Sequence, residues 1–160
     1  MKKLEIEESK AVTAYKNGDQ TVKKLLDDLF GDKTFKPVME RIKSFEDALA
    51  EVGGNANQNI LLSYNGVDNE VLVPQAYYKL RIIAKALQEG WQPDWTNSNE
   101  AKWSVWFKYK SGVGFVVFVA YYVNAITGTF CGSRLCFPTS EMARYFGEQF
   151  LELHRIVLEN

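Results

Sequence analysis

The sequence is poor in the residues that build common catalytic and metal sites. It has one histidine, His154, and two cysteines among 160 residues. A Ser–His or Cys–His catalytic pair would have to use His154, which falls on the apolar stripe of the last predicted helix. One histidine and two cysteines cannot supply a tetrahedral zinc site, and no glycine-rich phosphate-binding fingerprint is present. We therefore expect no metal site, no cofactor and no catalytic residue of a familiar type.

Neither sign of charge prevails, and no apolar run is long. The 19 basic and 20 acidic residues give a formal net charge of -1, so non-specific binding to nucleic acid is not expected. The longest apolar stretch, 113–123, is too short for a membrane helix. The charged start MKKLEIEESK lacks the apolar stretch of a signal peptide. These absences predict a soluble, cytoplasmic protein without a membrane segment.

The two cysteines predict no disulfide. Cys131 and Cys136 are five residues apart in what we interpret as one strand, so their side chains should point to opposite faces. A disulfide between them would require that strand to be broken. We expect two buried thiols in a reducing compartment.

The composition is that of a globular protein. Hydrophobic residues make up 46% of the chain and aromatic residues 14%, which is enough for a substantial core. The length fits one domain. We therefore predict a single domain over residues 1–160, with residues 1–10 as a frayed tail.

Helical spacing of apolar residues and capping signals predict five helical segments. Asp19 and Gly31 delimit the first, and Ser44 with Asp47 forms a capping-box pattern at the third. Gly147 lies within the last segment, where close approach to a sheet or a break in the helix would explain it. Residues 60–64 fit a short strand or the end of a helix equally well. The predicted helices cover about 19–30, 37–43, 44–53, 74–89 and 139 onward.

Three strands follow the fourth helix in the prediction. Residues 103–110 alternate between apolar and polar, 114–123 are apolar on both faces, and 130–137 form the third strand. Short connections imply an antiparallel meander. The fold class is thus α+β, with a three-stranded antiparallel meander in the C-terminal half and N-terminal and C-terminal helices packed on it. A central second strand covered on both faces would make Phe118→Ala cost about 3–5 kcal/mol and Val119→Ala about 2 kcal/mol.

A tryptophan-rich segment departs from this pattern. All four tryptophans lie between residues 91 and 106, interleaved with Asp, Asn, Thr and Ser. Indoles supply large contact areas and the polar groups supply directional hydrogen bonds, which suits a binding surface; alternatively, the indoles only fasten a long loop onto the core. Trp106 stands on the otherwise polar face of its predicted strand. On the first interpretation at least one of Trp95 and Trp106 is substantially exposed, beside Asp94, Asn97 or Asn99. The candidate binding residues are Trp91, Asp94, Trp95, Asn97, Asn99, Trp106 and Arg134.

Arg134 is a candidate because it lies among apolar neighbours in the third predicted strand. It could be a surface residue of an edge strand, or it could form an ion pair with Asp94 or Glu100. It could also anchor an anionic ligand.

Two segments resemble a known group of proteins. The runs AYYKLRIIAKALQEGWQPDWTNSNEAKWSVWF and GSRLCFPTSEMARYFGEQF are similar to uncharacterised short proteins from bacteroidete genomes and their phages. The similarity covers about residues 75–151. That group has no assigned activity, so the resemblance implies a phage or mobile-element context and no chemistry.

Two functional hypotheses remain. The first is a non-enzymatic binding or accessory protein of a phage or mobile element that engages a partner through the tryptophan-rich loop. The partner would be a protein, with a small ligand as the alternative. The second is an enzyme of unfamiliar type that uses Asp94, Glu100 or His154. The sequence does not indicate the oligomeric state.

Overall fold

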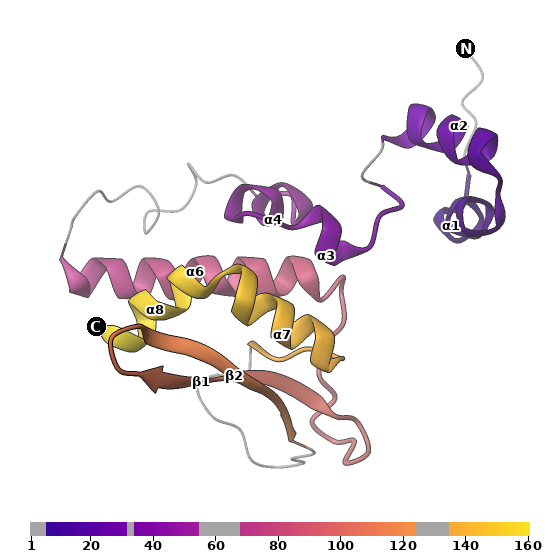
Figure 1. The fold of residues 1–160 in the computed structure, drawn as a ribbon. Coiled ribbons are helices and arrows are strands. Elements are labelled where there is room, and N and C mark those ends of the chain that lie inside the picture. Colours follow the sequence, from indigo (N-terminus) through magenta and orange to yellow (C-terminus); the bar gives the residue numbers. More distant parts are fainter. Residues whose placement is uncertain (1–5, 32–33, 55–67, 124–134) are drawn as a thin grey trace. The chain divides into compact units, whose positions relative to one another are not determined.

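The computed structural model describes residues 6–31, 34–54, 68–123 and 135–160 (Figure 1). These residues belong to two compact units, Met1–Arg41 and Ile42–Asn160, and each unit is described by itself. The sequence predicted one domain over residues 1–160, and the division into two units does not test that prediction.

The first unit contains three helices, α1 (Glu8–Asn17), α2 (Gln20–Phe30) and α3 (Val38–Arg41). Helix α1 begins inside the segment expected to be frayed. Asp19 caps α2, because its Oδ1 accepts hydrogen bonds from the backbone N–H groups of Thr21 and Val22, both at 2.9 Å. Gly31 ends α2 with a φ of 90°, a conformation that glycine adopts readily. The first predicted helix is therefore confirmed with its cap and its terminator.

The second unit opens with α4 (Phe45–Glu51) and α6 (Asn69–Leu87). The capping box of Ser44 and Asp47 is present at the start of α4, as predicted. Helix α6 begins five residues before the predicted start, because Asp68 caps it and Pro74 lies inside the helix instead of in its first turn. Its buried face includes Leu80, Ile83 and Leu87. Residues 60–64 lie outside the described residues.

The described part of the sheet is a two-stranded hairpin of β1 (Lys102–Lys110) and β2 (Gly114–Val123). The strands pair antiparallel, with a register shift between Trp106 and Phe107. On the other edge of β1, Trp103 and Phe137 exchange backbone hydrogen bonds of 2.9 and 2.8 Å in an isolated bridge. The α+β class is confirmed, but the three-stranded meander is wrong for the residues described. The predicted third strand over 130–137 contributes this single bridge next to β1, and residues 124–134 lie outside the description.

One face of the hairpin is covered by the last two helices, α7 (Ser140–Gln149) and α8 (Leu151–Glu159). Thr139 caps α7. Phe146 of α7 is fully buried against Phe137, with ring centroids 4.9 Å apart. Helix α6 packs against α8 and α4, so all of these helices lie on the same side of the sheet (Figure 1).

The opposite face of the hairpin is exposed. Phe118 and Val119 of β2 are 60% and 41% exposed. Both lie on this face because Phe118 is the unpaired residue of a β-bulge, since Val119 pairs with Trp106 and Val117 with Phe107. The prediction of a central strand covered on both faces is therefore wrong, because the helices stack in layers on one side of the sheet. The large losses expected for Phe118→Ala and Val119→Ala no longer follow, since little buried area would be removed.

Gly147 allows α7 to approach the sheet closely. A Cβ atom at this position would lie 2.5 Å from Cγ2 of Val105 and 3.1 Å from Cγ2 of Val117. Close approach, the first of the two explanations predicted for this glycine, is thus correct. The helical run also breaks, at Phe150, whose φ of -113° separates α7 from α8.

We expect Gly147→Ala to lower the free energy of unfolding by about 1–3 kcal/mol through overpacking. In an exposed helix the same change would stabilise by about 1 kcal/mol. Chemical denaturation distinguishes the two signs. Arg144→Ala, an exposed change in the same helix, is the control and should shift stability by less than about 1 kcal/mol. A more stable Gly147→Ala protein would contradict the close contact.

Candidate binding surface

The carboxylate of Glu100 organises the tryptophan-rich loop. Its Oε1 accepts a hydrogen bond of 3.0 Å from Nε1 of Trp91. Its Oε2 accepts one of 2.7 Å from the backbone N–H of Asp94. Nζ of Lys102 lies 3.3 Å from the same Oε2. One side chain thus joins the start and the middle of the loop to the first residue of β1.

Lys102 is fully buried beneath this loop, with an exposed fraction of 0%. Its Nζ donates hydrogen bonds to the carbonyl oxygens of Asn97, at 2.9 Å, and Glu100, at 3.0 Å. The ring of Trp95 lies 5.8 Å from the same nitrogen, within range of a cation–π contact. A buried ammonium is stable only when its donors are satisfied, and these two carbonyl oxygens together with Oε2 of Glu100 satisfy them.

Polar side chains of the loop fix its backbone. Oδ1 of Asp94 accepts hydrogen bonds from the backbone N–H of Thr96, at 2.8 Å, and from its hydroxyl, at 2.6 Å. The hydroxyl bond is the largest cause of the lowered pKa of Asp94. Oδ1 of Asn97 accepts from the backbone N–H of Asn99 at 2.9 Å. These are side-chain turns that shape the loop.

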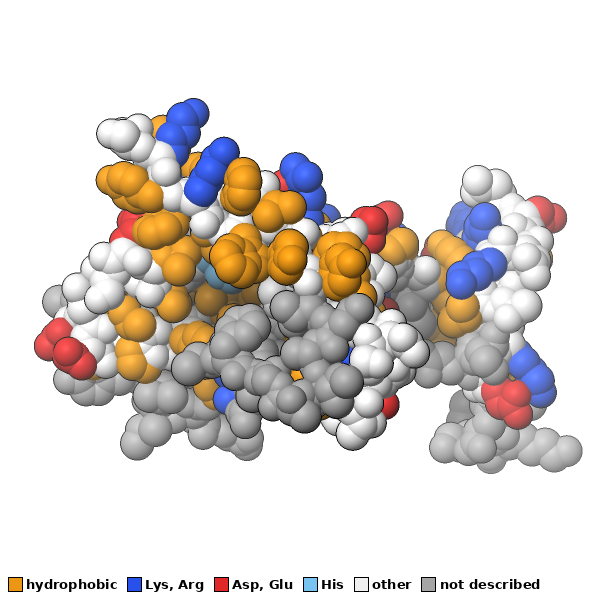
Figure 2. All heavy atoms as spheres, turned by 90° about the horizontal axis from the view of Figure 1, so that it is seen from below, with side chains coloured by type: hydrophobic (Ala, Val, Ile, Leu, Met, Phe, Trp, Pro, Cys, Tyr) orange, Lys and Arg blue, Asp and Glu red, His pale blue; other side chains and the backbone are white. Residues whose placement is uncertain are grey.

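A second feature is the exposed face of the hairpin, which we call the outer face and define by Trp106, Phe118, Val119 and Tyr121. Trp106 and Tyr121 are each 56% exposed, and their rings meet edge to face with centroids 6.1 Å apart. Lys108 borders the outer face, with its Nζ 4.7 Å from the ring centroid of Phe118. Figure 2 views the second unit from this side and shows hydrophobic side chains gathered on its surface.

The structure separates the predicted site residues into two groups. Trp91, Asp94, Trp95 and Asn97 surround Glu100 and Lys102 at the end of the sheet, and Asn99 is exposed in the same loop. Trp106 lies on the outer face with Tyr121. Arg134 lies outside the described residues.

Sequence reasoning missed three residues of this region. Phe118 and Tyr121 belong to a strand with apolar residues on both faces, which was interpreted as a buried central strand. Lys102 was one of several polar residues beside the tryptophans, and no signal in the sequence marked it as buried.

The groups named for the enzyme hypothesis are buried or engaged. His154 is 5% exposed and lies between the rings of Phe107 and Phe146, at 4.6 and 4.8 Å. Burial lowers its pKa to about 4. Burial likewise raises the pKa of the Cys136 thiol to about 11, which leaves it protonated and unreactive at neutral pH. Glu100 holds the loop as described. Among the described residues no group of three or more His, Cys, Asp or Glu could hold a metal ion.

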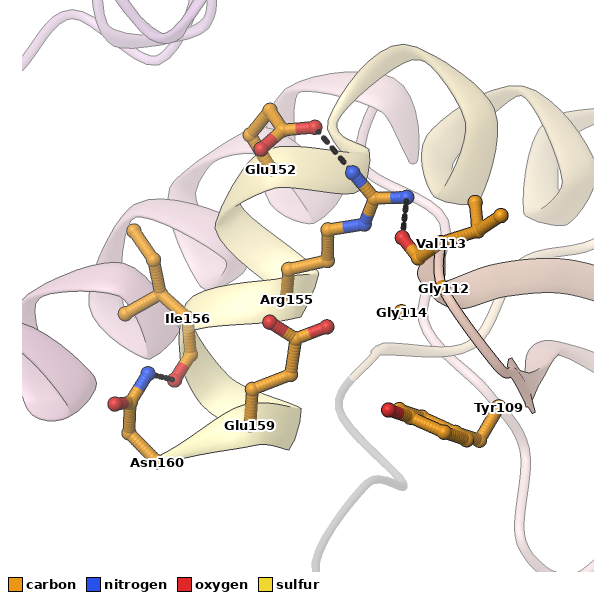
Figure 3. A pocket seen from close by; sticks show the side chains of 9 residues that line it. All are labelled: Tyr109, Gly112, Val113, Gly114, Glu152, Arg155, Ile156, Glu159 and Asn160. Atoms are coloured by element: carbon orange, nitrogen blue, oxygen red, sulfur yellow. Dashed lines mark hydrogen bonds and ion pairs between the residues drawn. The ribbon is translucent and has the colours of Figure 1, made fainter.

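A pocket of about 500 Å³ opens between the hairpin turn and α8 (Figure 3). Arg155 crosses it and donates to the carbonyl oxygens of Phe115, at 3.0 Å, and Val113, at 3.2 Å. It also donates to a carboxylate oxygen of Glu152 at 3.0 Å. Oε1 of Glu159 accepts from the backbone N–H of Phe115 at 3.3 Å. These hydrogen bonds hold the hairpin turn against α8, so we interpret the polar groups of the pocket as structural contacts between the two elements.

No protein-family model, curated protein or solved structure matches the chain. Within the described ranges no helix has both the length and the apolar character needed to cross a membrane. The functional assignment therefore rests on the geometry of the outer face and of the loop beside it.

Proposed function

We propose that this chain is a non-enzymatic binding or accessory protein that engages a protein partner through the outer face. The observation that supports this is the exposure of Trp106, Phe118 and Tyr121 together on one sheet face. Soluble proteins rarely expose contiguous large apolar patches that serve no binding purpose. Tryptophan and tyrosine are also the side chains that contribute most to protein interfaces.

The chemistry of the outer face favours a protein partner over a nucleic acid or a small ligand. Small ligands bind in concave sites, whereas these side chains lie on an open strand surface. Lys108 contacts Phe118 at the border of this face, but the chain carries no net positive charge, so phosphate backbones would find little attraction. The phage or mobile-element context rests only on the resemblance over residues 75–151.

The tryptophan-rich loop has a supporting role in this proposal. The bonds of Glu100 and Lys102 hold the loop at the end of β1 where the outer face begins. A rigid frame lowers the entropy lost when a partner binds. The loop thus fixes the position of β1, and the aromatic side chains of the outer face make the contact.

Trp106→Ala tests this proposal. Because the indole is largely exposed, the melting temperature should change little. Partner affinity should weaken by about 2 kcal/mol or more, as for a central interface aromatic. Thermal melting and quantitative capture of the partner are measured on the same preparations.

Tyr109→Ala is the matched control. Tyr109 is an exposed aromatic of the same strand, but its ring contacts Phe115 near the hairpin turn. This variant should bind the partner as the unaltered protein does. If Trp106→Ala binds normally, or if Tyr109→Ala weakens binding equally, the outer face is not the contact.

A further inference from the structure

Helix α2 of the first unit exposes an apolar stripe. Leu25 and Leu29 are 57% and 63% exposed, and Val22 at the preceding turn is also exposed. Leu26, on the adjoining side, is buried. The spacing of three and four residues places the exposed side chains on one face, which the other described residues of the first unit leave uncovered.

The charges of α2 are arranged against its own dipole. Lys23 and Lys24 lie in its N-terminal half, and Asp27 and Asp28 lie in its C-terminal half. A helix favours acidic residues near its N-terminus and basic residues near its C-terminus. This order of charges therefore slightly destabilises an isolated α2. A partner helix whose acidic residues lie beside these lysines, and whose basic residues lie beside these aspartates, would offset that effect.

Two of these charges are available to such a partner. Lys23 and Asp27 face α1, where Nζ of Lys23 lies 5.9 Å from the ring of Tyr15 and the Tyr15 hydroxyl donates to Asp27 at 3.4 Å. Lys24 and Asp28 are four residues apart and both are exposed, so they lie along the other flank of the stripe.

We propose that α2 pairs antiparallel with α2 of a second copy of this chain. Centring the pair between Leu25 and Leu26 sets Val22 of each copy opposite Leu29 of the other. The same alignment brings Lys24 beside Asp28 on the facing helix, and the two helix dipoles oppose each other favourably. A twofold-symmetric parallel pair would instead place this flank beside the opposite flank of the facing helix, with Lys24 level with Lys23 and Asp28 level with Asp27. The sequence of α2 is thus complementary to itself in one orientation only.

The dimer is of the weak, concentration-dependent class. The exposed parts of the stripe side chains amount to roughly 300–400 Å² per copy, against about 800 Å² per partner in a standard interface. This surface is distinct from the outer face. Dimerisation would give one assembly two copies of the partner-binding surface, which raises avidity without new contacts.

Sedimentation equilibrium of the full chain tests the proposal. The unaltered protein should show a monomer–dimer equilibrium, and Leu25→Gln, which keeps a good helix former, should be monomeric. Lys24→Glu and Asp28→Lys should each weaken the dimer about tenfold by setting like charges side by side. The double variant Lys24→Glu/Asp28→Lys should restore the original affinity, because the pair is re-formed with its signs exchanged.

Circular dichroism separates this effect from a loss of fold. Lys24→Glu removes a charge that opposes the helix dipole but sets a glutamate four residues before Asp28, so these two small effects oppose each other and the helix content should stay about the same while the dimer weakens. A protein that stays monomeric at high concentration would overturn the proposal. So would single variants whose defect the double variant does not repair, or a dimer that Trp106→Ala abolishes and Leu25→Gln leaves intact.

Discussion

Lys102→Met is expected to lower the free energy of unfolding by about 3 kcal/mol. Methionine keeps most of the side-chain volume but donates no hydrogen bond. The carbonyl oxygens of Asn97 and Glu100 and the Glu100 carboxylate would each lose a donor. The loop from Trp91 onward should then loosen, since Glu100 is the group that joins it to β1. Urea denaturation measures the first effect, and the emission of the tryptophans reports the second.

Lys108→Met is the matched control. Lys108 lies in the same strand, and its side chain is exposed beside Phe118. Its removal should change stability by less than about 1 kcal/mol. Equal effects of the two variants would show that Lys102 is not the buried centre of the loop.

The protein is also expected to lose about 2 kcal/mol of stability between pH 7 and pH 5 through His154 alone. The folded state holds this imidazole neutral with a pKa of about 4, because burial lowers it from the usual 6.5. The unfolded state therefore binds the proton first as the pH falls. The contribution of His154 is fully present above pH 6.5 and is lost progressively as the pH approaches 4.

Unfolding measured across this pH range checks the expectation, and His154→Phe is the comparison. Phenylalanine fits an aromatic setting between Phe107 and Phe146 and has no proton to bind. Between pH 7 and pH 5, the stability of this variant should fall by about 2 kcal/mol less than the stability of the unaltered protein. Identical pH profiles would show that His154 is hydrated or already charged in the folded state.

Local structure was predictable wherever a few neighbouring residues determine it. Asp19 caps the helix that it was expected to begin, and the last helical segment begins at residue 139 as expected, with Thr139 as its cap. The bonds of a capping box involve only residues three apart. Gly147 was also interpreted correctly, because a glycine within a helix needs a reason and close packing is a common one.

Tertiary arrangement was not predictable in the same way. A strand that is apolar on both faces looks alike in sequence whether helices cover both of its faces or only one. Strand β2 was therefore assigned a central place, while the structure exposes Phe118 and Tyr121. The burial of Lys102 depends on a loop folding back over the end of the sheet, which no spacing of residues encodes.

Only part of the candidate site was predicted, because the rest of it depends on tertiary arrangement. Trp106 was singled out because it interrupts the polar face of its strand, and its exposure is confirmed. It contacts Tyr121 on the outer face, whereas it was expected beside Asp94, Asn97 or Asn99. The polar residues around Trp95 were interpreted as ligand contacts, whereas Asp94 and Asn97 bond mainly to their own loop. Side-chain turns and binding sites use the same residue types, so composition alone does not separate them.

Site-specific photocrosslinking at position 118 tests the central claim most directly. A photoreactive phenylalanine analogue in place of Phe118 should leave the fold intact, because that side chain is exposed. The same analogue in place of Arg81, an exposed residue of α6, is the control. In cells that naturally make the protein, we expect the analogue at position 118 to form one discrete adduct with a partner protein and the analogue at position 81 to form none. Capture of a partner without any adduct at position 118, or equal adducts from both positions, would contradict a binding role for the outer face.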